Sequence, residues 1–324
     1  MDNRKIERAC EVLFQGDLVV MPTETVYGLA ADALQGLAVA KIYELKQRPQ
    51  FNPLIVHVAS FDHAQQWGIF SRLAAQLADR FWHKCPSPLT LVVPLRPDTS
   101  IAPLVSAGLK TIAIRVPFHP IALSLLNAYG KPLAAPSANP STHISPTTAL
   151  AVWNSFGSKT PFLLDGGACV VGLESTILDL SAEKPVLLRP GATTPEMLEA
   201  VLGYPVAFDT KGEVKAPGMM KRHYAPNLPL RLNCLHPQEG EAFLGFGKST
   251  TQQPTLNLSH QEDLSEAAAN LFSMLAALDR PPFTGISVMP IPNKGLGFAI
   301  NDRLRRAAAP VDSLHLEGEP HLLA

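Results

Sequence analysis

The sequence predicts an α/β protein with a twisted mixed sheet, followed by a smaller α/β domain. Apolar runs of strand length recur between segments whose apolar residues have helical spacing. These strand-like runs do not alternate strictly with helices, which favours a mixed sheet over a purely doubly wound one. At about residue 204 glycine, proline and charged residues replace the pattern, and a second set of elements begins near residue 241.

The elements of the first part follow from this spacing. Apolar residues from Ile6 to Phe14 recur every three or four positions, which predicts a helix over residues 2–15 that ends at Gly16. The same spacing predicts helices over residues 36–46, 71–83, 119–129, 147–156 and 194–202. Short apolar and β-branched runs predict strands over residues 18–21, 54–58, 89–95, 111–116, 132–135, 161–164, 174–180 and 185–188.

The second part is shorter and follows a region of different texture. Strands are predicted over residues 241–245 and 285–289, and helices over residues 263–279 and 297–308. About 95 residues are enough for a small independent domain. We therefore predict three segments: a first domain over residues 1–205, a linker over residues 206–228, and a Rossmann-like α/β domain over residues 229–324.

Composition and charge narrow the function classes. The 324 residues are enough for two hydrophobic cores. The 27 Lys and Arg residues balance 28 Asp and Glu to a net charge of -1, which argues against duplex nucleic acid as the main partner. The four cysteines include no C-x-x-C pair, so no zinc-finger spacing is present. No apolar run reaches the ~20 residues of a membrane span and the N-terminus is charged, so we expect a soluble, cytoplasmic protein.

Two cations stand close together on a predicted loop. Lys46 and Arg48 follow a helix and precede Pro49, at the edge of the sheet. The planar guanidinium of Arg48 can bind a phosphate through two hydrogen bonds, and Lys46 adds a point charge. The pair therefore fits a phosphate clamp, with a solvated basic turn as the alternative.

A second polar group follows an apolar strand. Ser137 and Asn139 come directly after Leu133–Ala135, where Pro136 breaks the strand pattern. A hydroxyl and an amide at the carboxyl end of a strand are well placed to contact a nucleotide, because ligands of α/β sheets lie there. A polar turn is the alternative, since Ser and Asn are common turn residues.

Two side chains are unusual for apolar strands. Thr111, Ala113 and Arg115 share one face of their strand, because successive side chains alternate. An arginine in such a strand needs an anion, which is either a core carboxylate or the carboxylate of a ligand. His57 also lies within an apolar strand, where a satisfied core residue is the more common role.

One motif resembles a phosphate-binding loop without meeting its requirements. Gly245–Ser249 is similar to the end of a Walker A sequence, but the position five residues before Gly247 is Ala242 instead of glycine. No helix is predicted to begin at Ser249. We therefore assign no phosphate site to this segment.

Seven short motifs in one order closely resemble the threonylcarbamoyl-AMP synthase family, whose catalytic part is the YrdC-like domain. They are Thr23–Leu29, Lys46-x-Arg48, Asn52–His57, Arg115–Pro117, Ala135–Asn139, Gly172–Ile177 and Leu188–Gly191. Ala216–Met219 and His223–Pro226 resemble the linker of the long, two-domain form, and Gly295–Leu304 resembles its C-terminal domain. The resemblance implies a twisted mixed sheet of the YrdC-like type and covers nearly the whole chain.

The resemblance also implies an activity and a set of site residues. The family makes L-threonylcarbamoyl-adenylate from L-threonine, bicarbonate and ATP, releasing pyrophosphate, for N6-threonylcarbamoyladenosine at position 37 of tRNA. The residues expected around L-threonine are Thr23, His57, Arg115, Ala135 (through its backbone) and Ser175. Those expected around ATP are Lys46, Arg48, Asn52, Thr111, Ser137, Asn139, Ser145, Arg189, His223 and Tyr224, with Lys46 and Arg48 as the catalytic pair and the last two residues as part of a linker lid.

The resemblance further implies partners and a cofactor. Mg²⁺ is expected with ATP, held mainly by the phosphates, so no protein ligands to it are assigned. A downstream enzyme that transfers the threonylcarbamoyl group to tRNA is expected to use the product. Any contact of this chain with tRNA itself is expected to be weak. No membrane partner is expected.

Two other functions compete with this one. A carbamoyl-transfer enzyme of hydrogenase maturation contains a similar domain, but it adds an acylphosphatase-like domain and C-x-x-C zinc pairs that this sequence lacks. An RNA-binding protein without catalysis is the other alternative. Neutral net charge and the absence of a basic stripe or stacking aromatics weigh against it.

Overall fold

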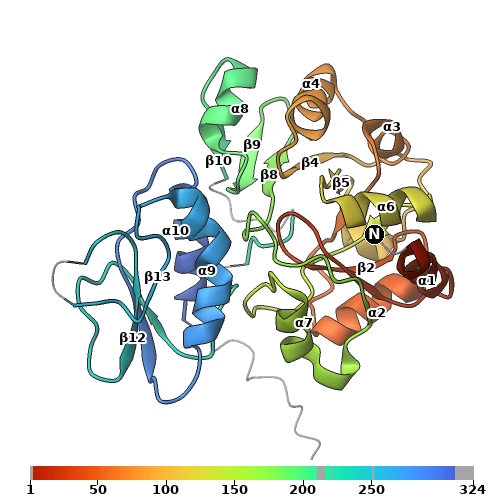
Figure 1. Ribbon diagram of the computed structural model, residues 1–324. Helices are drawn as coiled ribbons and strands as arrows, with labels where there is room; N and C mark the ends of the chain where they lie inside the picture. Colours follow the sequence, from red (N-terminus) through yellow and green to blue (C-terminus); the bar gives the residue numbers. More distant parts are fainter. Residues whose placement is uncertain (1–2, 210–215, 221, 250–251, 311–324) are drawn as a thin grey trace, which may run out of the picture.

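The computed structural model describes residues 3–209, 216–220, 222–249 and 252–310. Within these residues the strands form two sheets, one of ten strands and one of four (Figure 1). The ten-stranded sheet has the order β10-β9-β8-β4-β5-β3-β6-β2-β1-β7 and mixes parallel with antiparallel pairs. The predicted fold class, a twisted mixed sheet with a smaller α/β domain, is confirmed.

The elements around the ten-stranded sheet occupy the first two-thirds of the chain. The strands are β1 (Val19–Met21), β2 (Gly28–Asp32), β3 (Ile55–His57), β4 (Leu89–Pro94), β5 (Thr111–Arg115), β6 (Leu133–Ala134), β7 (Phe162–Leu163), β8 (Thr176–Asp179), β9 (Val186–Arg189) and β10 (Ala207–Phe208). The helices are α1 (Asn3–Phe14), α2 (Gly36–Lys46), α3 (Phe61–Ala64), α4 (Arg72–Ala78), α5 (Pro103–Ser106), α6 (Pro120–Tyr129), α7 (Ala149–Phe156) and α8 (Pro195–Leu202), with a π-helical turn η1 (Asp79–Lys84) and a 3-10 turn η2 (Gly157–Lys159).

Alternating side chains place different layers on the two faces of this sheet. Val19 and Met21 of β1 pack with α1 and α6, whereas Val20 between them packs with α2. Farther along the sheet, Ile55 of β3 and Ala113 of β5 face a third cluster. There the covering residues are Ala216 and Met219 from the segment after the sheet. The linker therefore lies over the face of the central strands on which Arg115 was predicted.

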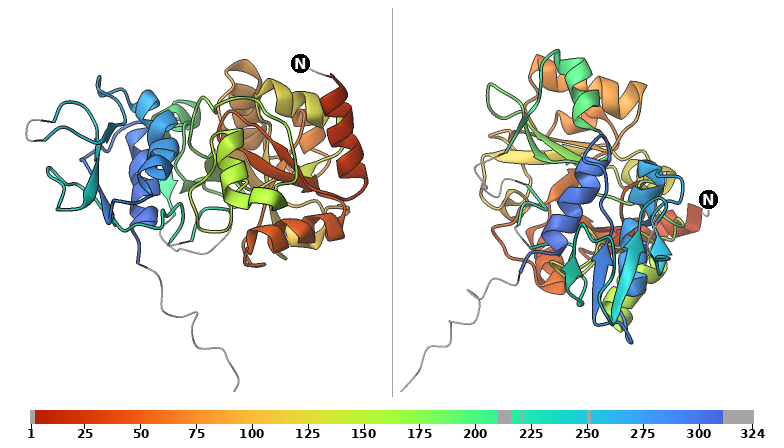
Figure 2. Two further views of the ribbon diagram at one scale, coloured as in Figure 1. Left: turned by 60° about the horizontal axis from the view of Figure 1, so that its bottom comes forward. Right: turned by 90° about the vertical axis from the view of Figure 1, so that its left-hand side faces the viewer.

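The four-stranded sheet follows residue 229 and is entirely parallel. Its strands are β11 (Leu230–Arg231), β12 (Glu241–Gly245), β13 (Leu256–Asn257) and β14 (Gly285–Val288), in the order β11-β14-β12-β13. Helices α9 (Leu264–Leu278) and α10 (Gly297–Ala307) lie on the side of this sheet that faces the rest of the protein (Figures 1 and 2). The predicted boundaries at residues 205 and 228 stay predictions.

The two parts share one apolar core. The cluster that contains α9 and α10 also takes in Val26, Leu173 and Tyr224, which come from the first domain and the linker. Gly172 lies directly against α9, where an added Cβ would come within 2.5 Å of the Cα of Ala269. This close approach of two backbones requires glycine at position 172.

Several elements differ from the predicted ones. The strand β2 was not predicted, and β10 joins the first sheet although residues 207–208 were assigned to the linker. The helix predicted over 71–83 is α4 continued by the π-helical turn η1. The short elements α3, α5, β11 and β13 were also missed. In the part of the chain that the structure describes, none of the helices combines the length and apolarity needed to cross a membrane.

Candidate active site

A small cavity lies where the linker covers the central strands. Its walls come from the loops that follow β1 and β6, from the ends of β3 and β5, from the start of β8, and from linker residues 217–218 and 223–224. The free space is about 40 Å³, which is room for a few water molecules. The linker therefore fills most of the site in this structure.

Arg115 and Glu24 form a buried ion pair at one end of the cavity. Nη2 of Arg115 donates to Oε1 of Glu24, and Nη1 donates to Oγ1 of Thr25 over 3.0 Å. Thr25 shares a 2.7 Å hydrogen bond with Thr23. Nε of Arg115 and Oε2 of Glu24 are buried without a partner among the described residues. Because unpaired buried polar atoms are costly, this end of the cavity is built for a polar ligand.

His57 faces the same space from the neighbouring strand. The strands β3 and β5 run in parallel with His57 opposite Arg115. Its Nδ1 is buried and has no partner within the described chain, which the alternative of a satisfied core histidine leaves unexplained. Burial, reinforced by the charge of Arg115, lowers the pKa of His57 to about 3. The imidazole is therefore neutral near pH 7 and can donate one hydrogen bond and accept another.

Ser175 and Arg189 form the wall next to this end. Arg189 donates from Nε and Nη2 to the carbonyl oxygen of Ser175, at 3.0 and 2.9 Å. It also reaches Oγ of Ser175 at 3.2 Å and the carbonyl oxygen of Pro217 in the linker at 3.2 Å. Oγ of Ser175 shares a 2.7 Å hydrogen bond with Oγ1 of Thr90. Arg189 thus joins β9, the start of β8 and the linker.

Lys46 and Arg48 are buried, so the alternative of a solvated basic turn is wrong. Nζ of Lys46 donates to the carbonyl oxygens of Ser137, at 2.5 Å, and of Asn139. Arg48 donates to the carbonyl oxygens of Asn52 and Pro53, at 3.1 and 2.8 Å. Burial lowers the pKa of Lys46 well below its usual value, and that of Arg48 to about 10. The hydrogen-bond acceptors of Lys46 and Arg48 are carbonyl oxygens, so no carboxylate in these contacts neutralises the two side chains.

Two amide side chains beside these cations are incomplete. Oδ1 of Asn52 and Oδ1 of Asn139 are both buried, and the described residues supply no hydrogen bond to either. Nδ2 of Asn139 donates to the carbonyl oxygens of Pro140 and His143, which fixes the side chain. A polar turn at Ser137 and Asn139 explains the course of the backbone. It does not explain why Oδ1 of Asn139 is buried without a hydrogen-bond donor.

His223 and Tyr224 close the cavity from the linker. Their ring centroids are 4.0 Å apart, and Tyr224 stacks on Phe272 of α9 at 5.6 Å. Nδ1 of His223 and the hydroxyl of Tyr224 have no partner in the described part of the chain. Gly218 has φ of 79°, and an added Cβ would lie 2.4 Å from the Tyr224 hydroxyl, so glycine is required there. Burial, together with the neighbouring cations, holds the pKa of His223 well below its usual range.

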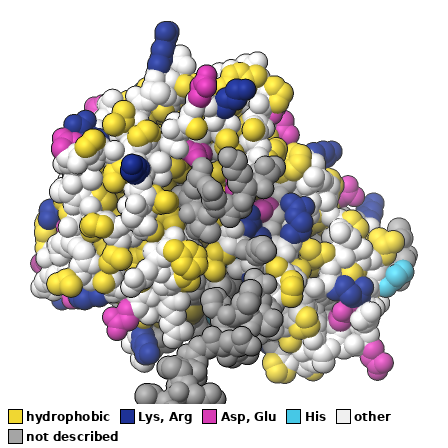
Figure 3. Space-filling view, turned by 180° about the vertical axis from the view of Figure 1, so that it is seen from behind, with side chains coloured by type: hydrophobic (Ala, Val, Ile, Leu, Met, Phe, Trp, Pro, Cys, Tyr) yellow, Lys and Arg dark blue, Asp and Glu magenta, His cyan; other side chains and the backbone are white. Residues whose placement is uncertain are grey.

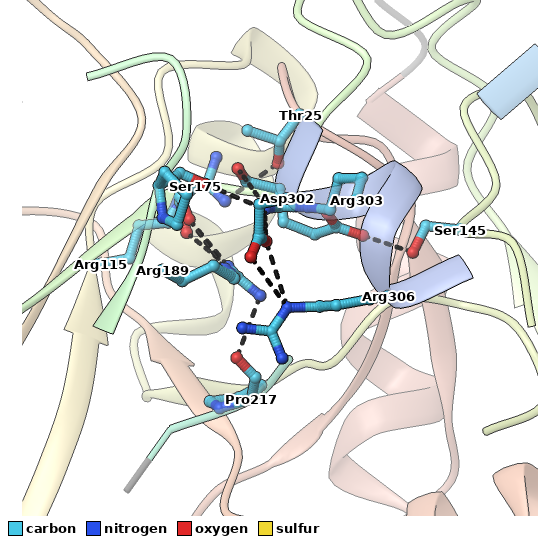
Figure 4. Close-up of polar contacts among 11 residues, drawn as sticks. Thr25, Arg115, Ser145, Ser175, Arg189, Pro217, Asp302, Arg303 and Arg306 are labelled. Atoms are coloured by element: carbon cyan, nitrogen blue, oxygen red, sulfur yellow. Dashed lines mark hydrogen bonds and ion pairs between the residues drawn. The ribbon is translucent and has the colours of Figure 1, made fainter. Parts of the chain in front are cut away.

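The C-terminal domain reaches this site through Arg303 of α10. Nε of Arg303 donates to Oε2 of Glu174 over 2.8 Å, and Ser145 donates to the other oxygen of Glu174 (Figure 4). Arg306, one turn further along the helix, donates to the carbonyl oxygen of Met220 at 2.8 Å. The linker and both domains therefore meet around one buried carboxylate.

Comparisons with known proteins agree with this architecture. The family model described as telomere recombination (Sua5, YciO and YrdC) matches residues 11–191, and the model described as the threonylcarbamoyl-AMP synthase C-terminal domain matches residues 193–309. The threonylcarbamoyl-AMP synthases of Bacillus subtilis and Pyrococcus abyssi are 39% and 38% identical to this chain. These alignments cover 94% of the chain, and 93% and 94% of the two relatives. The chain belongs to the threonylcarbamoyl-AMP synthase family.

A solved structure of the same family extends the likeness to three dimensions. The crystal structure of Pyrococcus abyssi Sua5 complexed with L-threonine superposes with a TM-score of 0.86 at 36% identity. The superposition covers 95% of each chain. The similarity therefore includes the linker and the C-terminal domain as well as the ten-stranded sheet.

The structure brings together most of the residues expected from the family motifs. The predicted residues that line the cavity are Thr23, Arg48, His57, Arg115, Ala135, Ser137, Ser175, Arg189, His223 and Tyr224. Five others lie outside its lining. Lys46 donates to the carbonyl oxygen of Asn139, Asn52 bonds Met220 of the linker at 3.5 Å, and Ser145 bonds Glu174. Thr111 is not among the lining residues and lies at the start of β5, four residues before Arg115.

Sequence reasoning missed four residues of the site. Glu24 and Thr25 bond Arg115, and Glu174 and Arg303 join the domains. Glu24 and Glu174 stood within the quoted motifs, and two charged residues in otherwise apolar or small-residue motifs could have suggested burial with a partner. Nothing near Arg303 in the sequence indicates that it reaches a residue 129 positions away.

Proposed function

We propose that this enzyme makes L-threonylcarbamoyl-adenylate from L-threonine, bicarbonate and ATP, with release of pyrophosphate. The observation that carries the proposal is the match to synthases over both domains, together with the close superposition on a threonine complex. The product serves the N6-threonylcarbamoyladenosine modification at position 37 of tRNA. Neither competing function has comparable support, because the matching synthases cover 94% of this chain.

L-Threonine binds at the Arg115 end of the cavity. The buried Nε of Arg115 is free to donate to the substrate carboxylate, which is the ligand alternative raised by its strand position. Neutral His57 can hydrogen-bond the threonine hydroxyl or amine. Thr23, Ser175 and the backbone of Ala135 complete this pocket. Glu24 accepts a hydrogen bond from Nη2 of Arg115, so Arg115 has a core carboxylate as one partner. The ligand carboxylate is proposed as its second anionic partner.

ATP binds at the end that holds the buried cations. Lys46, Arg48 and Arg189 supply positive charge for the phosphates, and the unpaired acceptors of Asn52 and Asn139 face donors of the nucleotide. The remaining ATP-binding residues we propose are Thr111, Ser137, Ser145, His223 and Tyr224. The described residues contain no group of three or more His, Cys, Asp and Glu side chains that could hold a metal ion. Mg²⁺ is therefore proposed to enter as the MgATP complex.

The reaction needs positioning more than proton transfer. The threonine amine and bicarbonate form a carbamate and water, and a carbamate oxygen then attacks the α-phosphorus as pyrophosphate leaves. Both reactants are anionic, so neutralising charge and holding them in line supply most of the catalysis. Lys46 and Arg48 are the residues we propose for this neutralisation.

The linker must leave the site for the substrates to enter. A free volume of about 40 Å³ is far below the roughly 300 Å³ or more of ordinary ligand pockets. We propose that the linker, of which residues 216–220 and 222–224 are described, acts as a lid that opens for ATP and closes over the labile product. A separate transfer enzyme then takes the product to tRNA in the cytoplasm. On the described part of the face in Figure 3, basic and acidic side chains are interspersed, so any contact with tRNA is expected to be weak.

The deciding experiment measures pyrophosphate release from MgATP, with L-threonine and bicarbonate added singly and together. Release that requires both supports the proposed synthesis. Release without threonine indicates a different adenylating or hydrolytic enzyme. A folded protein that releases none, yet binds RNA without ATP, would favour the RNA-binding alternative.

Arg48→Lys tests the phosphate role of the buried pair. Lysine keeps the charge but cannot hold the carbonyl oxygens of Asn52 and Pro53 together. We expect pyrophosphate release to fall by about tenfold or more, because a charge-assisted fork is lost. Turnover close to that of the wild type would contradict phosphate binding by Arg48.

A further inference from the structure

Arg303 is the largest side chain that is fully buried in the described chain, and it crosses between the domains. It belongs to α10, but each of its three guanidinium nitrogens has a hydrogen-bond acceptor in the first domain. Nε donates to Oε2 of Glu174 at 2.8 Å, and Nη2 donates to the Glu174 carbonyl oxygen at 3.3 Å. Nη1 donates to the carbonyl oxygen of Pro190 at 3.0 Å. Arg303 therefore holds two loops of the first domain in one fixed relation.

These two loops carry residues of the candidate active site. Glu174 immediately precedes Ser175 at the start of β8, and Pro190 immediately follows Arg189 at the end of β9. The strands are antiparallel, with Ile177 opposite Arg189, so the two loops are neighbours. The bonds from Arg303 to the first domain thus end on Glu174, which lines the cavity, and on Pro190, which adjoins the lining residue Arg189, while Nη1 also donates to Asp302 of α10 at 2.8 Å.

Glu174 carries the contact further towards the nucleotide end. Its side chain lines the cavity, with one oxygen bonded to Arg303 and the other bonded to Ser145. Both oxygens are therefore engaged, and the carboxylate has a fixed orientation. In the described structure the Ser145 hydroxyl is linked to the C-terminal domain through Glu174. Its hydroxyl direction follows from Glu174 and, through it, from Arg303.

The same guanidinium also contacts the lid. Its central carbon lies 5.1 Å from the ring centroid of Tyr224, within the range of a cation–π contact. The Tyr224 ring packs on Phe272 of α9 as well. The C-terminal domain is therefore connected to the site in two ways. Arg303 reaches Ser145 through Glu174, and Arg303 and Phe272 both contact Tyr224.

We infer that Arg303 is a positioning residue for ATP, so that the C-terminal domain sets the affinity of the first domain for the nucleotide. This inference rests on the proposed function, because it takes Ser145, Arg189 and Tyr224 to be ATP-binding residues. A purely structural role would lower stability and weaken both substrates alike. A positioning role weakens ATP binding far more than threonine binding, because Ser175 of the threonine pocket adjoins Glu174, whereas Thr23, His57 and Arg115 form no hydrogen bond with Arg303 in the described structure.

The test measures equilibrium binding of MgATP and, separately, of L-threonine by titration calorimetry on the full chain. Arg303→Lys keeps the positive charge and loses the fork that joins Glu174 to Pro190. We expect the Kd for MgATP to rise about tenfold, as for the loss of one charge-assisted hydrogen bond. The Kd for L-threonine should stay within a factor of about two. Arg305→Lys is the matched control, because Arg305 is exposed on the same helix.

A second set of variants keeps the inference testable if Arg303→Lys does not fold. Glu174→Gln preserves the shape of the link and removes its charge, and Ser145→Ala removes its far end. We expect Glu174→Gln and Ser145→Ala to weaken MgATP binding non-additively, because both act through one chain of bonds. Additive effects, or an unchanged Kd for MgATP in a folded variant, overturn the inference.

The outcomes also separate this inference from the proposed function. A wild-type chain that binds no MgATP overturns both. A wild-type chain that binds MgATP, with Arg303→Lys binding it equally well, overturns only the role of Arg303. Equal weakening of MgATP and L-threonine overturns the positioning role, because it indicates a general loss of structure.

Discussion

Two buried arginine–glutamate pairs frame the active site, and they differ in how completely they are satisfied. Arg115 and Glu24 lie within the first domain and have side chains 4% and 2% exposed. Arg303 and Glu174 join the two domains and are 0% and 8% exposed. The first pair leaves Nε of Arg115 and Oε2 of Glu24 without partners in the described structure, whereas every buried polar atom of the second pair is bonded.

The difference agrees with the two proposed roles, substrate binding for the Arg115 pair and positioning for the Arg303 pair. A buried charge pair contributes little net stability unless hydrogen bonds complete it, because removing both charges from water is costly. The Arg115 pair leaves two buried polar atoms without partners in the described structure, which agrees with the proposed binding of L-threonine there. The Arg303 pair is complete and holds loops in place. Burial and charge alone do not distinguish the two; the unpaired atoms do.

The largest expected effect comes from removing the arginine of the incomplete pair. Arg115→Ala should lower threonine-dependent pyrophosphate release by about a thousandfold, because the carboxylate of the substrate loses its charged partner. The measurement uses saturating MgATP and varied L-threonine. Arg115→Lys serves as the control that keeps the charge. A decrease below tenfold in Arg115→Ala would remove the distinction between the two pairs.

Next in size is the effect of Arg303→Ala on stability. This change leaves Glu174 as an uncompensated buried carboxylate and should lower the free energy of unfolding by about 3–5 kcal/mol. Arg115→Ala should cost less, since water can enter the cavity beside Glu24. Urea denaturation of both variants gives the comparison. Equal losses of stability would mean that the two pairs play the same structural part.

A smaller effect tests the histidine beside the incomplete pair. Because the pKa of His57 is about 3 in the folded chain, the unfolded chain takes up a proton first as the pH falls below about 6.5. The contribution of neutral His57 to the free energy of unfolding is fully present above that pH. It is lost as the pH falls towards 3, by up to about 1.4 kcal/mol per pH unit. His57→Gln should reduce this slope in urea titrations from pH 7 to 4. His223, whose pKa is also lowered, leaves a remaining slope. An unchanged slope would contradict a neutral, buried His57.

The smallest effect is expected at an exposed pair of similar geometry. Arg8 and Glu11 are 2.6 Å apart on α1, with side chains 56% and 60% exposed. Arg8→Ala should change the free energy of unfolding by less than about 1 kcal/mol, because water screens the pair. Thermal or urea unfolding measures this. A larger loss would show that short distance alone, without burial, decides the strength of these pairs.

The sequence predicted the fold class and many of the residues that line the cavity, for physical reasons that stay visible in the structure. The alternation in β5 placed Arg115 on the face of Ala113, and the structure puts both on the face covered by the linker. The break at Pro136 correctly marked the position at which Ser137 leaves the strand and reaches the cavity.

What the sequence could not predict depends on contacts between distant segments. Gly28–Asp32 contains no β-branched residue, yet it forms β2 because β1 and β6 pair with it on both sides. Glu24 and Arg115 are 91 residues apart, and only the folded sheet brings them together. The full burial of Arg303 depends on a carboxylate from the other domain, which no local pattern in α10 indicates.

The apolar core shared between the domains has a practical consequence for expression. Val26, Leu173 and Tyr224 complete the cluster built on α9 and α10, so a C-terminal piece made alone would present an open apolar surface to solvent. Such a piece should be poorly soluble, and its solubility should increase when the N-terminal piece is produced in the same cell. Separately made halves of this chain should therefore be co-expressed if they are to be purified.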